Sequence, residues 1–271
     1  MNFLRHAITI WKQDNVLRKV IRNSGYLFIG NAVSTMIQSI LSGRLLGILG
    51  FGILGAAIEF ATNINRLFSF RMAEIVVKYV GQFLAEGRRD RAAAVFKAAV
   101  LLETLSSILA YLLIVLLASP AAALILKDPD LAPLISFYAL AMLANFALES
   151  STGFLQATDR FRSQALINFL QSVLTSGLII YAYLTRGNIW LVMGAYLAGK
   201  TFNGLGLAAY AFWRARQIFG PGWWRAPFSL LPPRREFWRF AWSANFSATV
   251  TMITRDSESV WISLLLSPVA A

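Results

Sequence analysis

The chain has 271 residues, of which 57% are hydrophobic and 14% charged, and its formal net charge is +12. Soluble domains contain about 45–50% apolar and about 25% charged residues, so this composition indicates a chain that has lipid as its solvent. Cysteine is absent and His6 is the single histidine, which excludes disulfides, a cysteine nucleophile, a histidine-rich zinc site and a Ser-His-Asp triad within the membrane. We therefore expect an all-α integral membrane protein with no metal, cofactor or catalytic residue. Its basic residues lie mostly between apolar runs, which argues against a nucleic-acid partner.

Residues 1–23 combine basic and apolar side chains in a pattern typical of a helix that lies on the membrane surface. A disordered basic tail is the alternative. The segment does not resemble a cleavable signal, because the apolar run after it is too long and lacks an obvious small-residue cleavage site.

Seven segments further along are apolar and long enough to span a membrane, because a helix needs about 20 residues to cross about 30 Å of hydrocarbon. Each is expected to be helical, since an isolated strand leaves its backbone groups without hydrogen bonds in lipid. The first two segments are joined through Leu46–Gly52, which leaves room only for a tight turn. The predicted spans are residues 24–46, 48–70, 96–118, 131–153, 164–185, 189–212 and 240–266.

Lysine and arginine predict the orientation of these spans, because they are enriched in cytoplasmic connections. The N-terminal arm and the connections 2–3, 4–5 and 6–7 hold nearly all of them. The opposite side has only Arg44, Lys127 and Arg186. We expect the N-terminus to be cytoplasmic.

The longest connection, residues 214–239, is rich in proline, glycine, tryptophan and arginine, which is typical of a chain segment at the headgroup layer. We interpret it as a cytoplasmic linker. It separates a six-helix lobe, residues 24–213, from residues 240–271, which begin a second lobe. The chain stops soon after the seventh span, so we expect it to be the N-terminal part of a longer protein.

Polar residues recur at helical spacing in the spans, which marks helix faces turned away from lipid. Hydrogen bonds between neighbouring helices are the simpler explanation for single Ser, Thr and Asn residues. A charge at mid-membrane costs at least about 2.5–3.5 kcal/mol, so the ionisable residues favour a shared polar cavity. Its candidate cations are Arg66, Lys200, Arg255 and Arg44, and its candidate polar or ion-coupling residues are Glu59, Asn63, Asn31, Gln38, Asn203, Asn245, Asp256 and Glu258. The third and fourth spans also carry polar residues at helical spacing, Glu103, Ser106, Asn145 and Glu149, which are not among these candidates.

A cavity with cations at several depths suits an anionic substrate, since arginine binds phosphate through paired hydrogen bonds and lysine as a point charge. The acidic residues suit a coupling proton or sodium ion, and the sequence leaves these roles open. Arg255 and Glu258 can instead form a structural pair on one helix, and Arg44 can extend from its span end to the headgroups.

Four short stretches resemble one family of membrane proteins. Arg44–Gly52 is similar to the R-x-LG-x-x-x-FG signature of polysaccharide and O-antigen flippases, and Gly153–Phe161 to their G-x-L-x-A-x-x-R-F loop. Residues 78–90 resemble the family's connection between spans 2 and 3, and residues 236–245 the opening of its second lobe. Their order and spacing cover nearly the whole chain.

This resemblance implies two six-helix lobes that face each other, as in the superfamily that includes the multidrug and toxin extrusion (MATE) exporters. It implies transport of an undecaprenyl-diphosphate-linked oligosaccharide across a bacterial inner membrane by alternating access, for O-antigen or exopolysaccharide synthesis. The expected partners are this anionic diphosphate lipid, membrane lipids and other polysaccharide assembly proteins. No enzymatic activity is expected.

Three alternatives remain. The first is a MATE-like cation-coupled drug exporter, which the mixed cavity charges disfavour because such exporters favour acidic, aromatic cavities. The second is a membrane glycosyltransferase or ligase, which needs a sizeable loop with carboxylates, whereas the loop carboxylates here are scattered. The third is a non-transporting scaffold.

Overall fold

The computed structural model describes residues 15–68 and 71–232, and each regular element in these two ranges is a helix. Four segments there are long and apolar enough to cross a membrane: Gly30–Phe68, Arg89–Leu126, Pro129–Ala157 and Phe161–Leu184. The protein is therefore an all-α membrane protein, as its composition predicts. The predicted span 240–266 and residues 1–14 of the predicted arm lie outside the described residues, so the division into two lobes stays a prediction. Residues 15–23 of the predicted arm belong to the same helix as the first predicted span.

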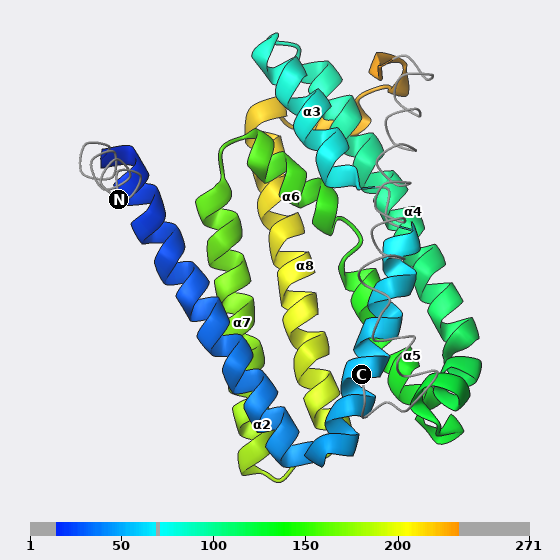
Figure 1. Ribbon diagram of the computed structural model, residues 1–271. Helices are drawn as coiled ribbons and strands as arrows, with labels where there is room; N and C mark the ends of the chain where they lie inside the picture. Colours follow the sequence, from blue (N-terminus) through cyan, green and yellow to red (C-terminus); the bar gives the residue numbers. More distant parts are fainter. Residues whose placement is uncertain (1–14, 69–70, 233–271) are drawn as a thin grey trace, which may run out of the picture.

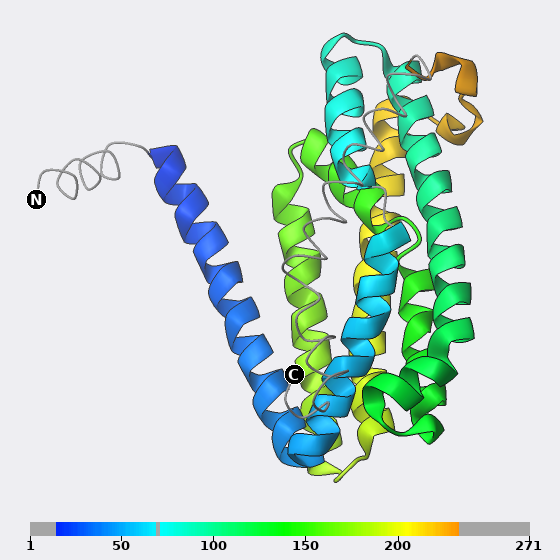
Figure 2. The same cartoon turned by 45° about the vertical axis from the view of Figure 1, so that its right-hand side comes forward.

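Helix α2 (Asn15–Phe68) forms two limbs joined by a sharp turn. Gly47, at the turn, has φ 69° and ψ 177°, a conformation in which a side chain is strained. The first limb lies against α7 and splays away from the other helices toward its N-terminal end, while the second limb returns into the bundle (Figures 1 and 2). The tight turn predicted within Leu46–Gly52 is confirmed.

Helix α3 (Met72–Ala85) lies in the connection predicted between spans 2 and 3, where no helix was anticipated. Its buried residues, Met72, Ile75, Val76, Tyr79, Val80 and Phe83, recur at steps of three and four and form one apolar face. This face packs against α4 and α6. Gly153 permits the close approach of α6, because a Cβ atom there would lie 2.5 Å from the carbonyl oxygen of Ala73.

The turn between α3 and α4 is exposed and held by side chains. The Glu86 carboxylate accepts hydrogen bonds from Arg88 at 2.9 Å and from Gln82 at 2.8 Å. These bonds, that of Arg88 above all, lower the pKa of Glu86 below its ordinary value. Gly87 between them has φ 75°, which favours glycine.

Helix α4 (Arg89–Ala121) crosses the whole molecule and continues as a π-helix, Ala122–Leu126. Pro120 lacks the N–H that an α-helix requires, so the regular ladder is interrupted near this end. Lys127 then adopts a left-handed conformation, φ 59°, and the short 3₁₀ helix Pro129–Leu131 leads into the next helix.

The predicted span 131–153 is not one helix. It consists of α5 (Ala132–Ala144) and α6 (Leu148–Ala157), which are separated by a break at residues 145–147. The expectation of an uninterrupted helix is corrected here. No glycine or proline marks the break in the sequence, and its cause is a contact with α4 described below.

Helices α7 (Phe161–Leu184) and α8 (Ile189–Phe219) run side by side and coincide with the fifth and sixth predicted spans (Figure 1). Lys200 and Asn203 lie within α8, which is not among the four segments apolar enough to span by themselves. The number of membrane crossings therefore stays a prediction.

Helix α8 continues through residues 214–219 of the predicted linker 214–239. The part of the linker that follows, residues 220–232, is folded against the other helices. It forms two 3₁₀ helices, Trp223–Arg225 and Phe228–Leu230. The ring of Trp223 lies 5.2 Å from that of Phe96 on α4, between ring centroids. The Lys97 amine donates a hydrogen bond to the Ala226 carbonyl and lies 3.9 Å from the centroid of the Phe228 ring. Residues 220–232 are thus part of the folded lobe.

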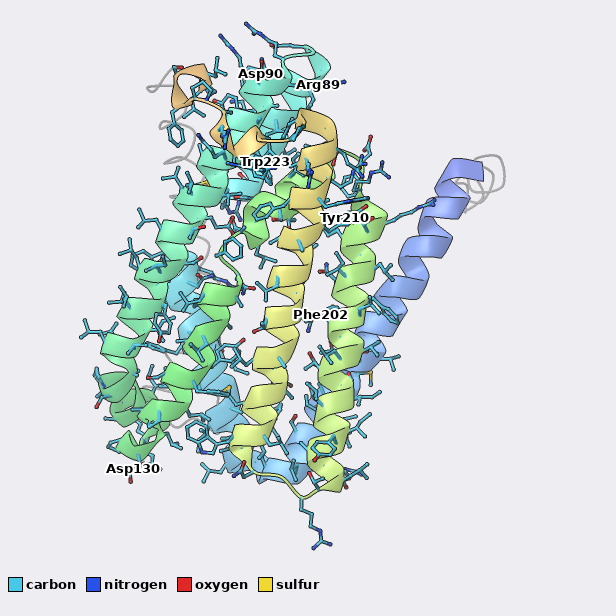
Figure 3. The ribbon with its side chains drawn as sticks, turned by 180° about the vertical axis from the view of Figure 1, so that it is seen from behind. Arg89, Asp90, Asp130, Phe202, Tyr210 and Trp223 are labelled. Atoms are coloured by element: carbon cyan, nitrogen blue, oxygen red, sulfur yellow. The ribbon has the colours of Figure 1, made fainter. Side chains whose placement is uncertain are left out.

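The ends of the bundle carry different charges, as predicted. Arg89 and Asp90 lie at one end and Asp130 at the other (Figure 3). The turn between α3 and α4, which holds Arg88, lies with Arg89, whereas Lys127 lies with Asp130 in the connection after α4. The side of the membrane that each end faces stays a prediction.

Candidate functional site

A polar layer divides the hydrophobic core into two parts. One apolar cluster includes Leu54, Ile114, Tyr138 and Met193, and the other includes Met72, Phe96, Phe154 and Leu207. Along each central helix, polar side chains occupy the interval between the two clusters. They are Asn65 of α2, Glu103, Ser106 and Ser107 of α4, Asn145 after α5, and Asn203 of α8.

Glu103 is the centre of this layer. Its side chain is 9% exposed, and its two carboxylate oxygens accept hydrogen bonds from the backbone N–H groups of Glu149, at 2.7 Å, and Ser150, at 2.8 Å. These amides belong to the first turn of α6, which has no partner within its own helix for them. A carboxylate is well suited to this position because the N-terminus of a helix carries a partial positive charge. Glu103 thus stabilises the break between α5 and α6.

A small cavity of about 50 Å³ adjoins Glu103. It is large enough for a few water molecules, and polar residues of α2, α4, α6 and the break between α5 and α6 line it. Its polar lining residues are Asn65, Glu103, Ser106, Ser107, Asn145 and Glu149.

A larger, more open pocket of about 380 Å³ lies on the other side of Glu149, between α3, α6, α7 and α8. Leu148 and Glu149 line both cavities. Arg71 lies in this pocket and its guanidinium donates to Glu74 Oε1 at 2.7 Å, while both side chains remain nearly half exposed. The other polar lining residues are Thr152, Gln164, Asn168 and Asn203.

Some of the predicted cavity residues come close to this layer. Asn203 lines the open pocket, and Lys200 is exposed one turn earlier on α8. Arg66 is exposed at the end of α2, directly after Asn65 of the small cavity, and Glu59 and Asn63 precede it on the same limb. The amide oxygens of Asn63 and Asn203 are buried without a hydrogen-bond partner in the described part of the chain, so each leaves an unused acceptor there.

Three other predicted residues lie elsewhere. Gln38 is buried between α2 and α7, where its amide donates to Ser172 O at 3.2 Å and to Ser176 Oγ at 3.1 Å. Asn31 lies on the same limb, about two turns before it, with its side-chain oxygen buried. Arg44 is exposed beside the Gly47 turn. Gln38 therefore holds two helices together, and Arg44 is remote from the polar layer.

The remaining predicted residues, Asn245, Arg255, Asp256 and Glu258, lie outside the described residues. The structure thus brings together parts of α2, α3, α4, α6, α7 and α8, and the contribution of the seventh span stays a prediction.

The whole-chain comparison agrees with this architecture. A family model described as "Polysaccharide biosynthesis protein" matches residues 20–271. The chain belongs to this family. It is also similar to "Inner membrane protein YghQ" of Escherichia coli (strain K12), with 25% identity over 277 residues that cover 96% of this chain and 74% of the relative. No solved structure matches the chain.

Membership of the polysaccharide biosynthesis family confirms the resemblance carried by the short motifs. The structure gives a physical reason for two of these motifs. Gly47 of the first motif forms the turn of α2, and Gly153 of the second permits the crossing of α3 and α6. Both motif glycines therefore support the architecture of the lobe.

Glu103, which accepts two backbone hydrogen bonds in the polar layer, is not among the residues that the sequence pattern singles out. Glu103 and Glu149 are polar residues of the predicted spans but are not among the candidate cavity residues, and Arg71, which follows the second predicted span, is not among them either. A signal did exist, because two polar pairs, Glu103–Ser106 and Asn145–Glu149, occupy neighbouring spans. That these pairs come together follows only once the break between α5 and α6 is known, and the local sequence does not mark this break.

Proposed function

We propose that the chain is part of a transporter that moves an undecaprenyl-diphosphate-linked oligosaccharide from the cytoplasmic to the periplasmic leaflet of a bacterial inner membrane. The product would enter polysaccharide synthesis, of the O-antigen or exopolysaccharide type. The protein acts by binding and conformational change and not as an enzyme.

One observation carries this proposal. Lys200 is an exposed cation in the middle of α8, one turn from Asn203, which lines the open polar pocket. A cation at this depth requires water or an anionic partner, and a diphosphate supplies the matching charge. Arg66, exposed beside the small cavity, adds a second cation near the same layer.

Alternating access supplies the mechanism. The six-helix lobe and a second lobe would rock about a polar cavity between them, so that the cavity opens first to one side and then to the other. The glycan would lie in the polar layer and the diphosphate would bind the exposed cations, while the prenyl chain stays in lipid. The basic end of the bundle, which includes Arg89, would face the cytoplasm.

The test is an export assay in cells that lack the gene. Lipid-linked oligosaccharide is expected to accumulate on the cytoplasmic leaflet, and the full-length wild-type gene is expected to restore export. Lys200→Gln is expected to reduce export roughly tenfold or more, since one hydrogen bond to a charged group contributes about 1.5–3 kcal/mol. Lys127→Gln is the matched control, because this lysine lies at the far end of the bundle, and it is expected to export normally.

Two results contradict the proposal. Normal export by Lys200→Gln in a protein present at the wild-type level removes the role of the cation. Drug sensitivity without accumulation of lipid-linked oligosaccharide favours the MATE-like exporter instead.

A further inference from the structure

Glu103 is a carboxylate whose charge is balanced by a helix terminus. Within residues 15–68 and 71–232 its partners come from the start of α6, and none of them is a lysine or arginine side chain. Burial of a carboxylate within a spanning segment is expensive. Such a group is retained where its ionised and protonated forms perform different tasks, or where it is needed as a permanent cap.

The cavity beside this carboxylate is lined by polar residues to which water can hydrogen-bond. The small cavity beside Glu103 is lined by the hydroxyl groups of Ser106 and Ser107 and by the amides of Asn65 and Asn145. Glu149 lines both this cavity and the open pocket, so it connects Glu103 with the wider of the two spaces.

The charged groups around Glu103 come from several helices. Glu149 is the other titratable residue of the small cavity, and α5 contributes no Asp, Glu, Lys, Arg or His. Helix α3 brings Arg71 and Glu74 to the open pocket. Arg66 lies in the last turn of α2, next to Asn65, and Lys200 lies one turn before Asn203 on α8. Lys97 of α4 and Arg225 of the folded linker are separated from Glu103 by the apolar cluster that contains Phe96. No ion pair between these groups and Glu103 exists in the described ranges.

We propose that Glu103 is a proton-binding site whose protonation releases the start of α6. In the ionised form each oxygen accepts one amide N–H. A proton taken from water in the cavity turns one oxygen into a donor, so one of the two amides loses its acceptor and the first turn of α6 shifts. When the proton returns to water, both hydrogen bonds form again.

The shift would reach the open pocket directly. Thr152, on the first turns of α6, lines that pocket, and Gly153 next to it packs against Ala73 of α3. The inference rests on the proposed transport function and names the proton as the ion that drives it. Sodium is the alternative ion, and the test below distinguishes it from the proton.

The test uses the absence of cysteine in the chain. Thr152→Cys places a single thiol in the open pocket, and Ser229→Cys places one at an exposed position in the folded linker. The full-length protein, with any cysteine after residue 271 replaced by alanine, is reconstituted in liposomes and labelled with a soluble maleimide from mildly acidic to mildly alkaline pH, in potassium and in sodium salts. Labelling of each thiol becomes faster as pH rises, because the thiolate is the reactive form, and the ratio of the two labelling rates corrects for this effect.

The ratio is expected to change with pH in the otherwise wild-type protein and to be independent of sodium. Glu103→Gln is expected to abolish the pH dependence and to hold the ratio at its low-pH value. Glu86→Gln is the control, since the same substitution at an exposed turn is expected to leave the pH dependence intact. If Glu103→Gln does not fold, Glu103→Asp keeps a titratable group and is expected to shift the midpoint.

A ratio that is constant with pH in the parent, or a pH dependence that survives in Glu103→Gln, reduces Glu103 to a permanent cap. An unshifted midpoint in Glu103→Asp, or a ratio that follows sodium and not pH, overturns the proposal as well. None of these measurements involves export. Failure here leaves the Lys200 assay unaffected, and failure of that assay leaves the proton site standing.

Discussion

The two interruptions in the helices of this lobe differ in what holds them. The turn of α2 is local, because Gly47 adopts a positive φ that suits glycine and nothing lies within 4 Å of where its Cβ would be. The break between α5 and α6 has no such residue. It depends on Glu103, 46 and 47 positions earlier in the chain, which caps α6 from a neighbouring helix.

The difference shows how a membrane protein can place an irregular segment at either of two depths. At the end of a helical hairpin, water and headgroups satisfy the backbone, so one glycine is enough. Between two apolar clusters, the freed amides need a partner from the protein. In this part of the chain, the break between α5 and α6 has a buried carboxylate and a cavity beside it, and the turn of α2 has neither. The break between α5 and α6 therefore creates a polar site.

Glu103→Ala tests the remote break and is expected to have the largest effect. It leaves two amides of α6 without their acceptor, at about 1–3 kcal/mol for each unsatisfied group. We expect a clear fall in the thermal unfolding temperature in detergent. Glu86→Ala is the control at an exposed position and is expected to change that temperature little. Equal temperatures for both variants contradict the capping role.

Gly204→Ala tests the same break from the side of α8 and is expected to have an intermediate effect. A Cβ atom there would lie 2.5 Å from Oδ1 of Asn145 and closer still to the Ala144 carbonyl oxygen, so α8 must move away. Such overpacking costs about 1–3 kcal/mol. Gly177→Ala is the matched control, because open space surrounds that glycine in α7 and alanine is the better helix former. Unfolding temperatures of the two variants in detergent are expected to move in opposite directions.

Gly47→Ala tests the local turn and is expected to have the smallest effect. The cost comes from the backbone alone, roughly 1–2 kcal/mol for a side chain in a left-handed conformation. Gly43→Ala is the control, since this glycine is helical and nothing lies within 4 Å of its Cβ position. A Gly47→Ala protein that unfolds at the same temperature as Gly43→Ala contradicts the role of the positive φ.

Much of the fold could be predicted from local patterns. Apolar length located α4, α7 and both limbs of α2, and glycine marked the turn between the limbs. Helix α3 was missed because its apolar face is too short to span a membrane and becomes visible only when it packs on α6. Among the candidate residues, Asn203 lines the open pocket, whereas Gln38 lies in a contact between two helices.

By itself, the sequence determined that lipid is the solvent, where most helices lie, and which end of the bundle is basic, because each of these follows from composition or from neighbours along the chain. Only the tertiary structure decided where the polar layer lies and what stabilises the break between α5 and α6. Both depend on hydrogen bonds between residues far apart in the chain, and the geometry of such a bond is fixed by how the helices pack.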